Sequence, residues 1–157
     1  PAANTEAWRA KFTKRQLTAY DHALATWNRY GDLTARYRKD PVDRATIEKV
    51  FERYTHNAIA LTDSYEANFI NGGVRIYAQP TPLSQTGRKI SLNPKGSLVE
   101  FDQCNDYTTL DIRRNGKPVH NAAPTKNATA IVRVQMDSDA AGNWRLFTSK
   151  VVDKPCA

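Results

Sequence analysis

The first half of the chain carries apolar residues at the three- and four-residue spacing of amphipathic helices. One stripe predicts a helix over residues 4–30, with Asn4 or Thr5 as its N-cap and Gly31 as its stop. It comprises Trp8, Phe12, Leu17, Tyr20, Leu24 and Trp27. A second stripe predicts a helix over residues 41–71 that comprises Ile47, Phe51, Tyr54, Ala58, Leu61, Tyr65 and Phe69.

Local signals set the ends of this second helix. Asp40-Pro41 reads as an N-cap followed by proline at the first helical position, and Asp43 lies near the positive end of the helix dipole. We expect a break near Thr55-His56-Asn57, and Asn71-Gly72-Gly73 predicts the end of the helix.

After Gly73 the apolar pattern changes to the two-residue period of strands. We expect strands over residues 73–79, 97–104, 107–113, 129–137 and 143–152. The polar segment over residues 80–96 contains three prolines and predicts either a loop or an irregular strand pairing. Asn115-Gly116 predicts a tight turn, and residues 139–142 predict a hairpin. Helices followed by an antiparallel meander indicate an α+β fold, with the N-terminal helices packed on a curved antiparallel sheet. Residues 1–157 then form a single domain, helical over about 4–71 and sheet over about 73–156.

Composition supports one globular domain. The chain has 157 residues, of which 40% are hydrophobic and 25% charged, and this excludes a disordered tail. The formal net charge is +7, and residues 67–99 contain four basic residues and no acid: Arg75, Arg88, Lys89 and Lys95. We expect a mildly basic surface there. Because no dense basic cluster or aromatic ladder accompanies it, we expect no nucleic-acid partner.

Two cysteines, Cys104 and Cys156, suggest a disulfide of an extracytoplasmic domain, although two unrelated buried thiols would also satisfy the count. The chain begins at Pro1 and its one methionine is Met136, so we expect the translation start, with a signal peptide or lipid anchor, to lie upstream. Membrane contact is expected only through that segment. Because metal-ligand spacing of Cys and His is absent, we expect no metal and no cofactor.

Motifs in the second half carry a family resemblance. The strand over residues 98–104 is followed by Asn105-Asp106, then by Asn115-Gly116, then by Gly142-Asn143-Trp144-Arg145 and a closing Cys156. In this order they resemble the nuclear transport factor 2-like, SnoaL-like and ketosteroid isomerase-like superfamily, especially its secreted or lipid-anchored actinobacterial and phage members. The resemblance implies a cone-shaped, cystatin-like roll. We expect structural roles for Asp106, as a cap of backbone N–H groups, and for Trp144, as a buried strand residue.

The same resemblance implies a pocket between the sheet and the helices, where the enzymes of this superfamily use an Asp or His base or a Tyr donor. The candidate pocket residues are Tyr20, Trp27, Tyr54, Tyr65, Asp111 and Arg113. Asp21 and His22 are further candidates, but neighbours on a helix point about 100° apart and do not form a ready dyad. No catalytic constellation matches residue by residue, so we assign no catalytic residue and expect a protein that is not an enzyme.

The expected function is therefore binding. We expect an extracytoplasmic domain of the cell envelope that is tethered in the manner of a lipoprotein. It would act on an envelope or phage protein. One version of this function is phage superinfection exclusion. A small apolar ligand, or an isomerase- or dehydratase-like activity in the cone pocket, is one alternative. Asn93-Pro94-Lys95-Gly96 resembles a turn in assembly domains of type IV secretion systems, so an assembly role with a surface near this turn is the other.

Overall fold

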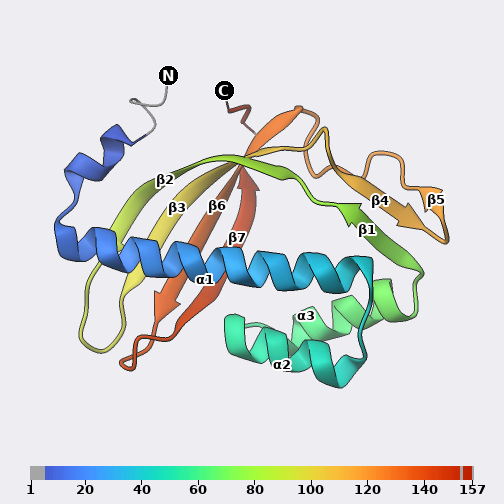
Figure 1. Ribbon diagram of the computed structural model, residues 1–157, viewed down its shortest axis with the longest axis horizontal. Coiled ribbons are helices and arrows are strands. Elements are labelled where there is room, and N and C mark those ends of the chain that lie inside the picture. Colours follow the sequence, from blue (N-terminus) through green and yellow to red (C-terminus); the bar gives the residue numbers. More distant parts are fainter. Residues whose placement is uncertain (1–5, 153, 157) are drawn as a thin grey trace.

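The computed structural model describes residues 6–152 and 154–156 and has the predicted α+β fold. Its helical part contains a 3-10 turn η2 (Ala7–Lys11), α1 (Lys14–Lys39), α2 (Arg44–Tyr54), α3 (Ala58–Tyr65) and a π-helical turn η3 (Glu66–Ile70). The strands are β1 (Val74–Ala78), β2 (Thr81–Ser91), β3 (Leu98–Asp106), β4 (Asp111–Arg114), β5 (Lys117–Pro118), β6 (Thr129–Ser138) and β7 (Trp144–Val152) (Figure 1).

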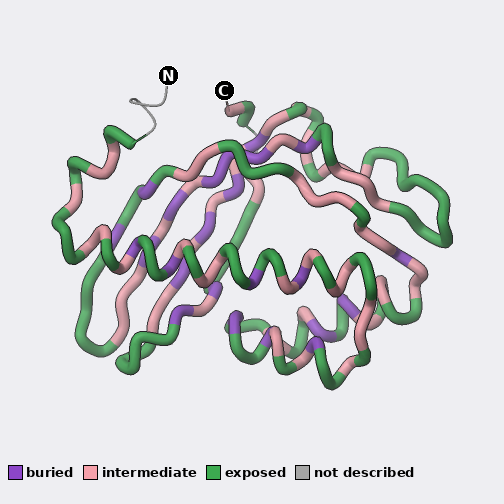
Figure 2. Tube along the Cα trace, in the orientation of Figure 1, coloured by how far each residue is buried: buried purple, intermediate pink, exposed green. Residues whose placement is uncertain are grey.

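The strands form two antiparallel sheets. The larger has the order β2-β3-β6-β7, and the smaller has the order β1-β4-β5. Strand β1 leads into β2, and β3 leads into β4. Two neighbouring chain segments therefore run through both sheets and form a long arch (Figure 1). Buried and partly exposed residues alternate along β3 and β6 (Figure 2), so each of these strands turns one face toward the helices.

The core lies between that inner face and α1. Tyr20 is 2% exposed and meets the ring of Phe101 edge to face at 5.9 Å. Burial raises the pKa of Tyr20 to about 12, with Arg9 opposing the shift, so its hydroxyl is neutral at ordinary pH. Farther along α1, the ring of Tyr30 packs near Tyr54.

The first helix differs from its prediction at both ends. Asn4 and Thr5 lie outside the described residues, and the observed N-cap of α1 is Thr13, which forms a capping box with Gln16. Gly31 does not stop the helix, which continues to Lys39. The reason is packing, because Thr34 is buried beyond the glycine and the burial outweighs the roughly 1 kcal/mol helix cost of glycine.

The second helix begins later than predicted. Its N-cap is Asp43, whose carboxylate accepts a hydrogen bond of 2.7 Å from the Thr46 N–H, and Asp40 instead follows the end of α1. The predicted break near Thr55 is confirmed, since α2 ends at Tyr54 and α3 begins at Ala58. Gly73 ends the helical half at φ 67°, a conformation that glycine adopts without strain.

Of the two alternatives for residues 80–96, the loop is wrong and the irregular pairing is confirmed, because most of the segment is strand β2, which pairs with β3 through two register shifts. Only Gly87 and Ile90 are buried in β2, which lies at the edge of the sheet. Its sequence is therefore mostly polar and lacks the two-residue apolar period of a strand with one buried face. Pro82 is tolerated because edge strands need fewer N–H donors. The strand predicted from residue 107 begins at Asp111, after a turn in which the Leu110 N–H donates to the Tyr107 carbonyl at 3.1 Å.

Both predicted turns are confirmed. Asn115 and Gly116 have φ 50° and 79° and connect β4 to β5, as expected of a two-residue hairpin turn. The hairpin after β6 closes with the Gly142 N–H donating to the Asp139 carbonyl at 3.1 Å. Asp106 accepts a hydrogen bond of 2.8 Å from the Thr108 N–H, and Trp144 is buried on β7.

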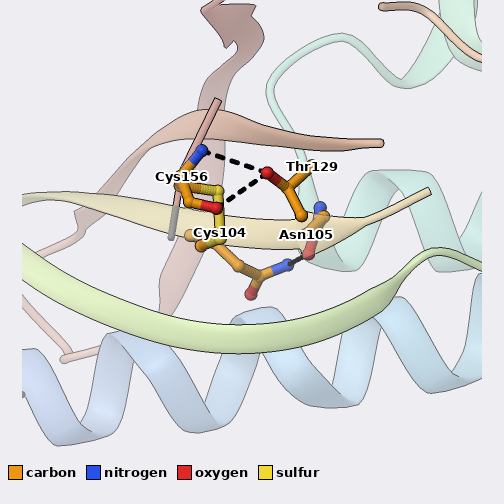
Figure 3. Close-up of a disulfide and its surroundings, with 5 residues drawn as sticks. Cys104, Asn105, Thr129 and Cys156 are labelled. Carbon is orange, nitrogen blue, oxygen red and sulfur yellow. Dashed lines mark hydrogen bonds between the residues drawn. A yellow bond between two sulfur atoms is a disulfide. The ribbon is translucent and has the colours of Figure 1, made fainter. Parts of the chain in front are cut away.

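The two cysteines form the predicted disulfide. Cys104 lies in β3 and Cys156 follows β7, 52 residues later (Figure 3). The backbone N–H of Cys156 donates to the Thr129 hydroxyl at 3.1 Å, and that hydroxyl donates to the Cys156 carbonyl at 2.7 Å. The C-terminal segment is thus fastened to both β3 and β6.

Removing this cross-link by Cys104→Ser with Cys156→Ser should lower the free energy of unfolding by about 4 kcal/mol, the chain-entropy value for a loop of this length. Chemical denaturation at equilibrium measures the loss. As a control, a reducing agent should destabilise the natural protein by the same amount and leave the double-serine variant unchanged. Equal stability of the two proteins under oxidising conditions would contradict a structural role.

Candidate ligand cavity

A cavity of about 690 Å³ lies between the second half of α1 and the inner face of the larger sheet. All four strands contribute to its floor, through Pro82 of β2, Asn105 of β3, Val132 of β6 and Ser149 of β7. Its apolar lining includes Trp27 and Tyr30 of α1, Leu61 of α3 and Leu146 of β7. A cavity of this volume with a mixed aromatic and polar lining is typical of ligand sites.

A network of side-chain amides crosses the floor of the cavity. Gln103 is 5% exposed, and its Oε1 accepts hydrogen bonds from Trp27 Nε1 at 3.0 Å and Gln85 Nε2 at 3.3 Å. Its Nε2 donates to Asn105 Oδ1 at 2.9 Å (Figure 3). The indole of α1 is therefore joined to β3 by a polar contact inside a mostly apolar region.

Three donors of the lining have no partner among the described residues. Gln79 Nε2 is buried without an acceptor, and neither Asn105 Nδ2 nor the Tyr30 hydroxyl forms a hydrogen bond there. Burial raises the pKa of Tyr30, with Arg38 opposing the shift, so its hydroxyl keeps its proton. Because a buried donor is normally paired, Gln79 Nε2 suits an added oxygen acceptor. The Tyr30 hydroxyl and Asn105 Nδ2 could donate to the carbonyl, carboxylate or hydroxyl oxygens of the same molecule.

Charged groups of the lining come from α1. Asp32 is exposed and Arg38 is half-buried, and neither forms an ion pair with another described residue. The remaining lining consists of amides, hydroxyls, aromatic rings and aliphatic groups. Such a set can orient a ligand through hydrogen bonds and ring contacts.

The residues predicted for a pocket are dispersed. Trp27 lines the cavity, whereas Tyr20, Tyr54 and Tyr65 lie in the core. The Tyr65 hydroxyl donates to the Tyr37 carbonyl at 2.6 Å and accepts from the Val42 N–H at 3.1 Å, so its hydrogen bonds serve the helices.

Asp111 and Arg113 lie outside the cavity, on β4 of the smaller sheet. They pair with each other at 2.9 Å, and the Arg113 guanidinium lies 5.1 Å from the ring centre of Tyr77. The guanidinium holds the pKa of Asp111 below its usual value. Neither side chain is free to act on a ligand in the cavity.

A second groove lies beside the first half of α1. His22 and Arg15 line it together with Trp144 and the turn after β2, which contains Asn93 and Pro94. Asp21 points elsewhere and pairs with Arg9 at 3.1 Å. The structure thus separates Asp21 from His22.

The turn Asn93-Pro94-Lys95-Gly96 connects β2 to β3. The Gly96 N–H donates to the Asn93 carbonyl at 3.1 Å, and the Lys95 N–H donates to Asn93 Oδ1 at 2.9 Å. A Cβ on Gly96 would lie 2.6 Å from the Ser138 carbonyl oxygen. Packing against β6 explains this glycine without a partner.

Of the four basic residues predicted to share a surface, Arg75 lies on the smaller sheet, and the other three lie on β2 or in the turn after it. Arg75 of β1 donates to the Phe69 carbonyl at 2.8 Å, and Arg88 of β2 pairs with Glu100 and Asp102. Lys89 is exposed on β2, and Lys95 is exposed in the turn that follows it. The two arginines therefore have protein partners.

Sequence reasoning missed the amides that characterise the cavity. Gln103 and Asn105 continue the inward series Val99 and Phe101 along β3. Amides at the inward positions of a buried strand are unusual, because burial of a polar group costs free energy unless it is paired. The signal in the sequence was therefore the two-residue spacing that places Gln103 and Asn105 on the same side of the strand as Val99 and Phe101.

Comparisons with known proteins identify no family. No protein-family profile matches the chain, and a search of curated proteins finds no match. Among solved structures, the intermembrane space region of the chloroplast protein ARC6 is similar at 10% sequence identity and a TM-score of 0.47. The match covers 83% of this chain and 93% of that one.

The described residues contain neither a candidate membrane span nor a candidate metal site. No described helix is both long and apolar enough to span a bilayer. Within the same residues, no group of three or more His, Cys, Asp or Glu side chains is placed to hold a metal ion.

Replacing Gln103 by leucine should lower the free energy of unfolding by about 1–3 kcal/mol, because the Trp27 indole N–H and the side-chain Oδ1 of Asn105 lose their partner inside the protein. Chemical denaturation measures the loss, and the Trp27 fluorescence should change with it. Gln135→Leu is the matched control, since Gln135 lies on β6 with its side chain on the opposite face, bonded to Glu100. A loss at Gln135 as large as that at Gln103 would contradict the importance of the buried network.

Proposed function

We propose that this chain is an extracytoplasmic binding domain that holds part of a partner protein in the cavity beneath α1. The observation that carries the proposal is the set of unpaired donors, Tyr30, Gln79 and Asn105, beside the aromatic surface of Trp27. Peptide segments present the carbonyl oxygens that such donors need, together with side chains that fill an apolar cavity.

Gly31 supports a role for the cavity mouth. It lies within α1, lines the cavity, and a Cβ placed on it would meet nothing within 4 Å. A glycine inside a helix costs stability relative to alanine, so packing gives no reason for it here. In the proposed function it leaves room for the partner.

The disulfide is consistent with an oxidising, extracytoplasmic compartment, where such bonds persist. We place the domain at the cell envelope, tethered by a lipoprotein-type segment. Its partner would be a phage protein if the domain serves superinfection exclusion, and a conjugation or secretion component if it serves assembly. The identity of the captured partner separates these versions.

A small ligand is the second candidate, because the cavity volume and its mixed lining suit a compact molecule. An isomerase or dehydratase reaction on that ligand would also need an acid or base beside it. Asp32, the carboxylate of the described lining, is exposed at the mouth. This arrangement favours binding over proton transfer.

The test places a photo-crosslinking amino acid at Asn28, an exposed position on the cavity lining, in cells that carry the full-length protein. We expect one dominant protein crosslink. In the same background, Gly31→Leu should abolish it while leaving the fold intact, because the new side chain enters open space and favours the helix. Crosslink yield and thermal unfolding are the two measurements.

Two controls accompany this experiment. The crosslinker at Arg29, which is exposed and does not line the cavity, should capture far less of the same protein. Ala25→Leu, an exposed α1 substitution outside the cavity, should leave the Asn28 crosslink unchanged. Capture that is insensitive to Gly31→Leu would contradict binding in the cavity. A co-purifying small molecule that Gly31→Leu expels, without a protein crosslink, would establish the second candidate instead.

A further inference from the structure

Building on the proposed function, we infer that the partner binds as an extended, acidic segment that adds a strand to the free edge of β7. The larger sheet ends at β7, which pairs with β6 on one side. On its other side, contacts among the described residues lie at the start of the strand. The Arg53 guanidinium donates to the Trp144 carbonyl at 3.4 Å, Thr55 forms a bridge with Leu146, and the His56 N–H donates to the Leu146 carbonyl at 3.2 Å. Beyond that point no described strand covers the edge.

The edge that remains is regular. From Thr148 to Val152 the register against β6 runs without a shift, after a bulge near Phe147. Exposed main-chain N–H and C=O groups in such a strand can pair with an added strand. The opposite edge of the sheet is less suitable, since β2 contains Pro82 and two register shifts.

The cavity reaches this strand at two residues. Ser149 lines the cavity and, with Leu146, belongs to the β7 residues that share the inner face. Alternate side chains of an added strand would point to the same face, because strand side chains alternate between the two sides of a sheet. They would therefore enter the end of the cavity that Leu146 and Ser149 line.

Charge distinguishes an acidic segment from a second copy of this chain. Lys150 is exposed on β7 and Arg38 lies at the cavity, and neither forms an ion pair with a described residue. Antiparallel pairing of two β7 edges about an axis near Ser149 would bring two Lys150 side chains together, and like charges there oppose self-pairing. An acidic segment would instead gain two cationic partners.

The probe is a library of random peptides of about ten residues, long enough for a typical strand, selected on the disulfide-bonded protein. We expect the selected peptides to be acidic, with the side chain of every second residue directed to the inner face of the sheet. A scan that methylates one peptide N–H at a time should weaken binding roughly tenfold at every second position and little between, because an added strand turns alternate N–H groups to its neighbour.

Lys150→Glu should weaken the selected peptides roughly tenfold at low salt and less at high salt, since it replaces an attraction by a repulsion. Lys89→Glu is the matched control, because Lys89 is likewise exposed but lies on the opposite edge strand, β2. It should change the dissociation constant less than about twofold, as expected of a charge outside the interface.

The outcomes separate the two proposals. Failure to select any peptide, a methylation scan without a two-residue period, or equal effects of Lys150→Glu and Lys89→Glu would each overturn strand addition. A Gly31-sensitive crosslink from Asn28 would still support the proposed function in those cases, and would indicate a partner bound through a folded surface. Strand addition with no crosslink from Asn28 would support the edge and remove the cavity from the proposed function.

Discussion

The packing of one long helix against two different surfaces determines the rest of the structure. The first half of α1 rests on the larger sheet, where Tyr20 meets Phe101. The second half rests on α2 and α3, where Tyr30 lies near Tyr54 and the Tyr37 carbonyl accepts a hydrogen bond from Tyr65. A helix of 26 residues spans about 39 Å, so its two halves lie over different supports. The cavity occupies the region between these supports.

The amide network explains how this spacing is kept without filling the cavity. An apolar floor would favour closer contact with α1, because dispersion and hydrophobic burial both increase with contact. The bond between Trp27 and Gln103 instead joins helix and sheet at a fixed distance. Gln103 also binds Gln85 and Asn105, which offsets its own cost of burial. Donors without a partner among the described residues remain around the network, and in the proposed function they would bind oxygen atoms of the partner.

The sequence predicted elements whose pattern comes from burial on one face. The inner residues of β3 and β6, the break after Tyr54 and the Asn115-Gly116 turn all follow from local pattern. Predictions were wrong where tertiary contacts override local preference. Gly31 lies inside a helix because residues after it are buried. For β2 the sequence left a loop and an irregular pairing open, because an edge strand exposes most of its side chains.

The cavity was harder to predict for a related reason. Aromatic residues on one helix can face a core, a pocket or both. Only the three-dimensional arrangement shows that Tyr30 belongs to the core and also lines the cavity, whereas Tyr20 belongs to the core alone. The carboxylate and guanidinium of Asp111 and Arg113 satisfy each other on a separate sheet, which a linear sequence does not reveal. Gln79 becomes notable only because its Nε2 is buried without a partner.

The two edges of the larger sheet are protected in different ways. Strand β2 has a proline and two register shifts, which hinder any added strand. Strand β7 is covered at Leu146 by Thr55 and His56, and His56 also bonds Asp137 at 2.6 Å. Its remaining length is regular and has Lys150 as a charge that opposes self-pairing. The positive charge of Lys150 repels a second positively charged strand but attracts an acidic one, whereas Pro82 hinders pairing with any strand. The β7 edge therefore combines protection against self-association with access for a partner of opposite charge.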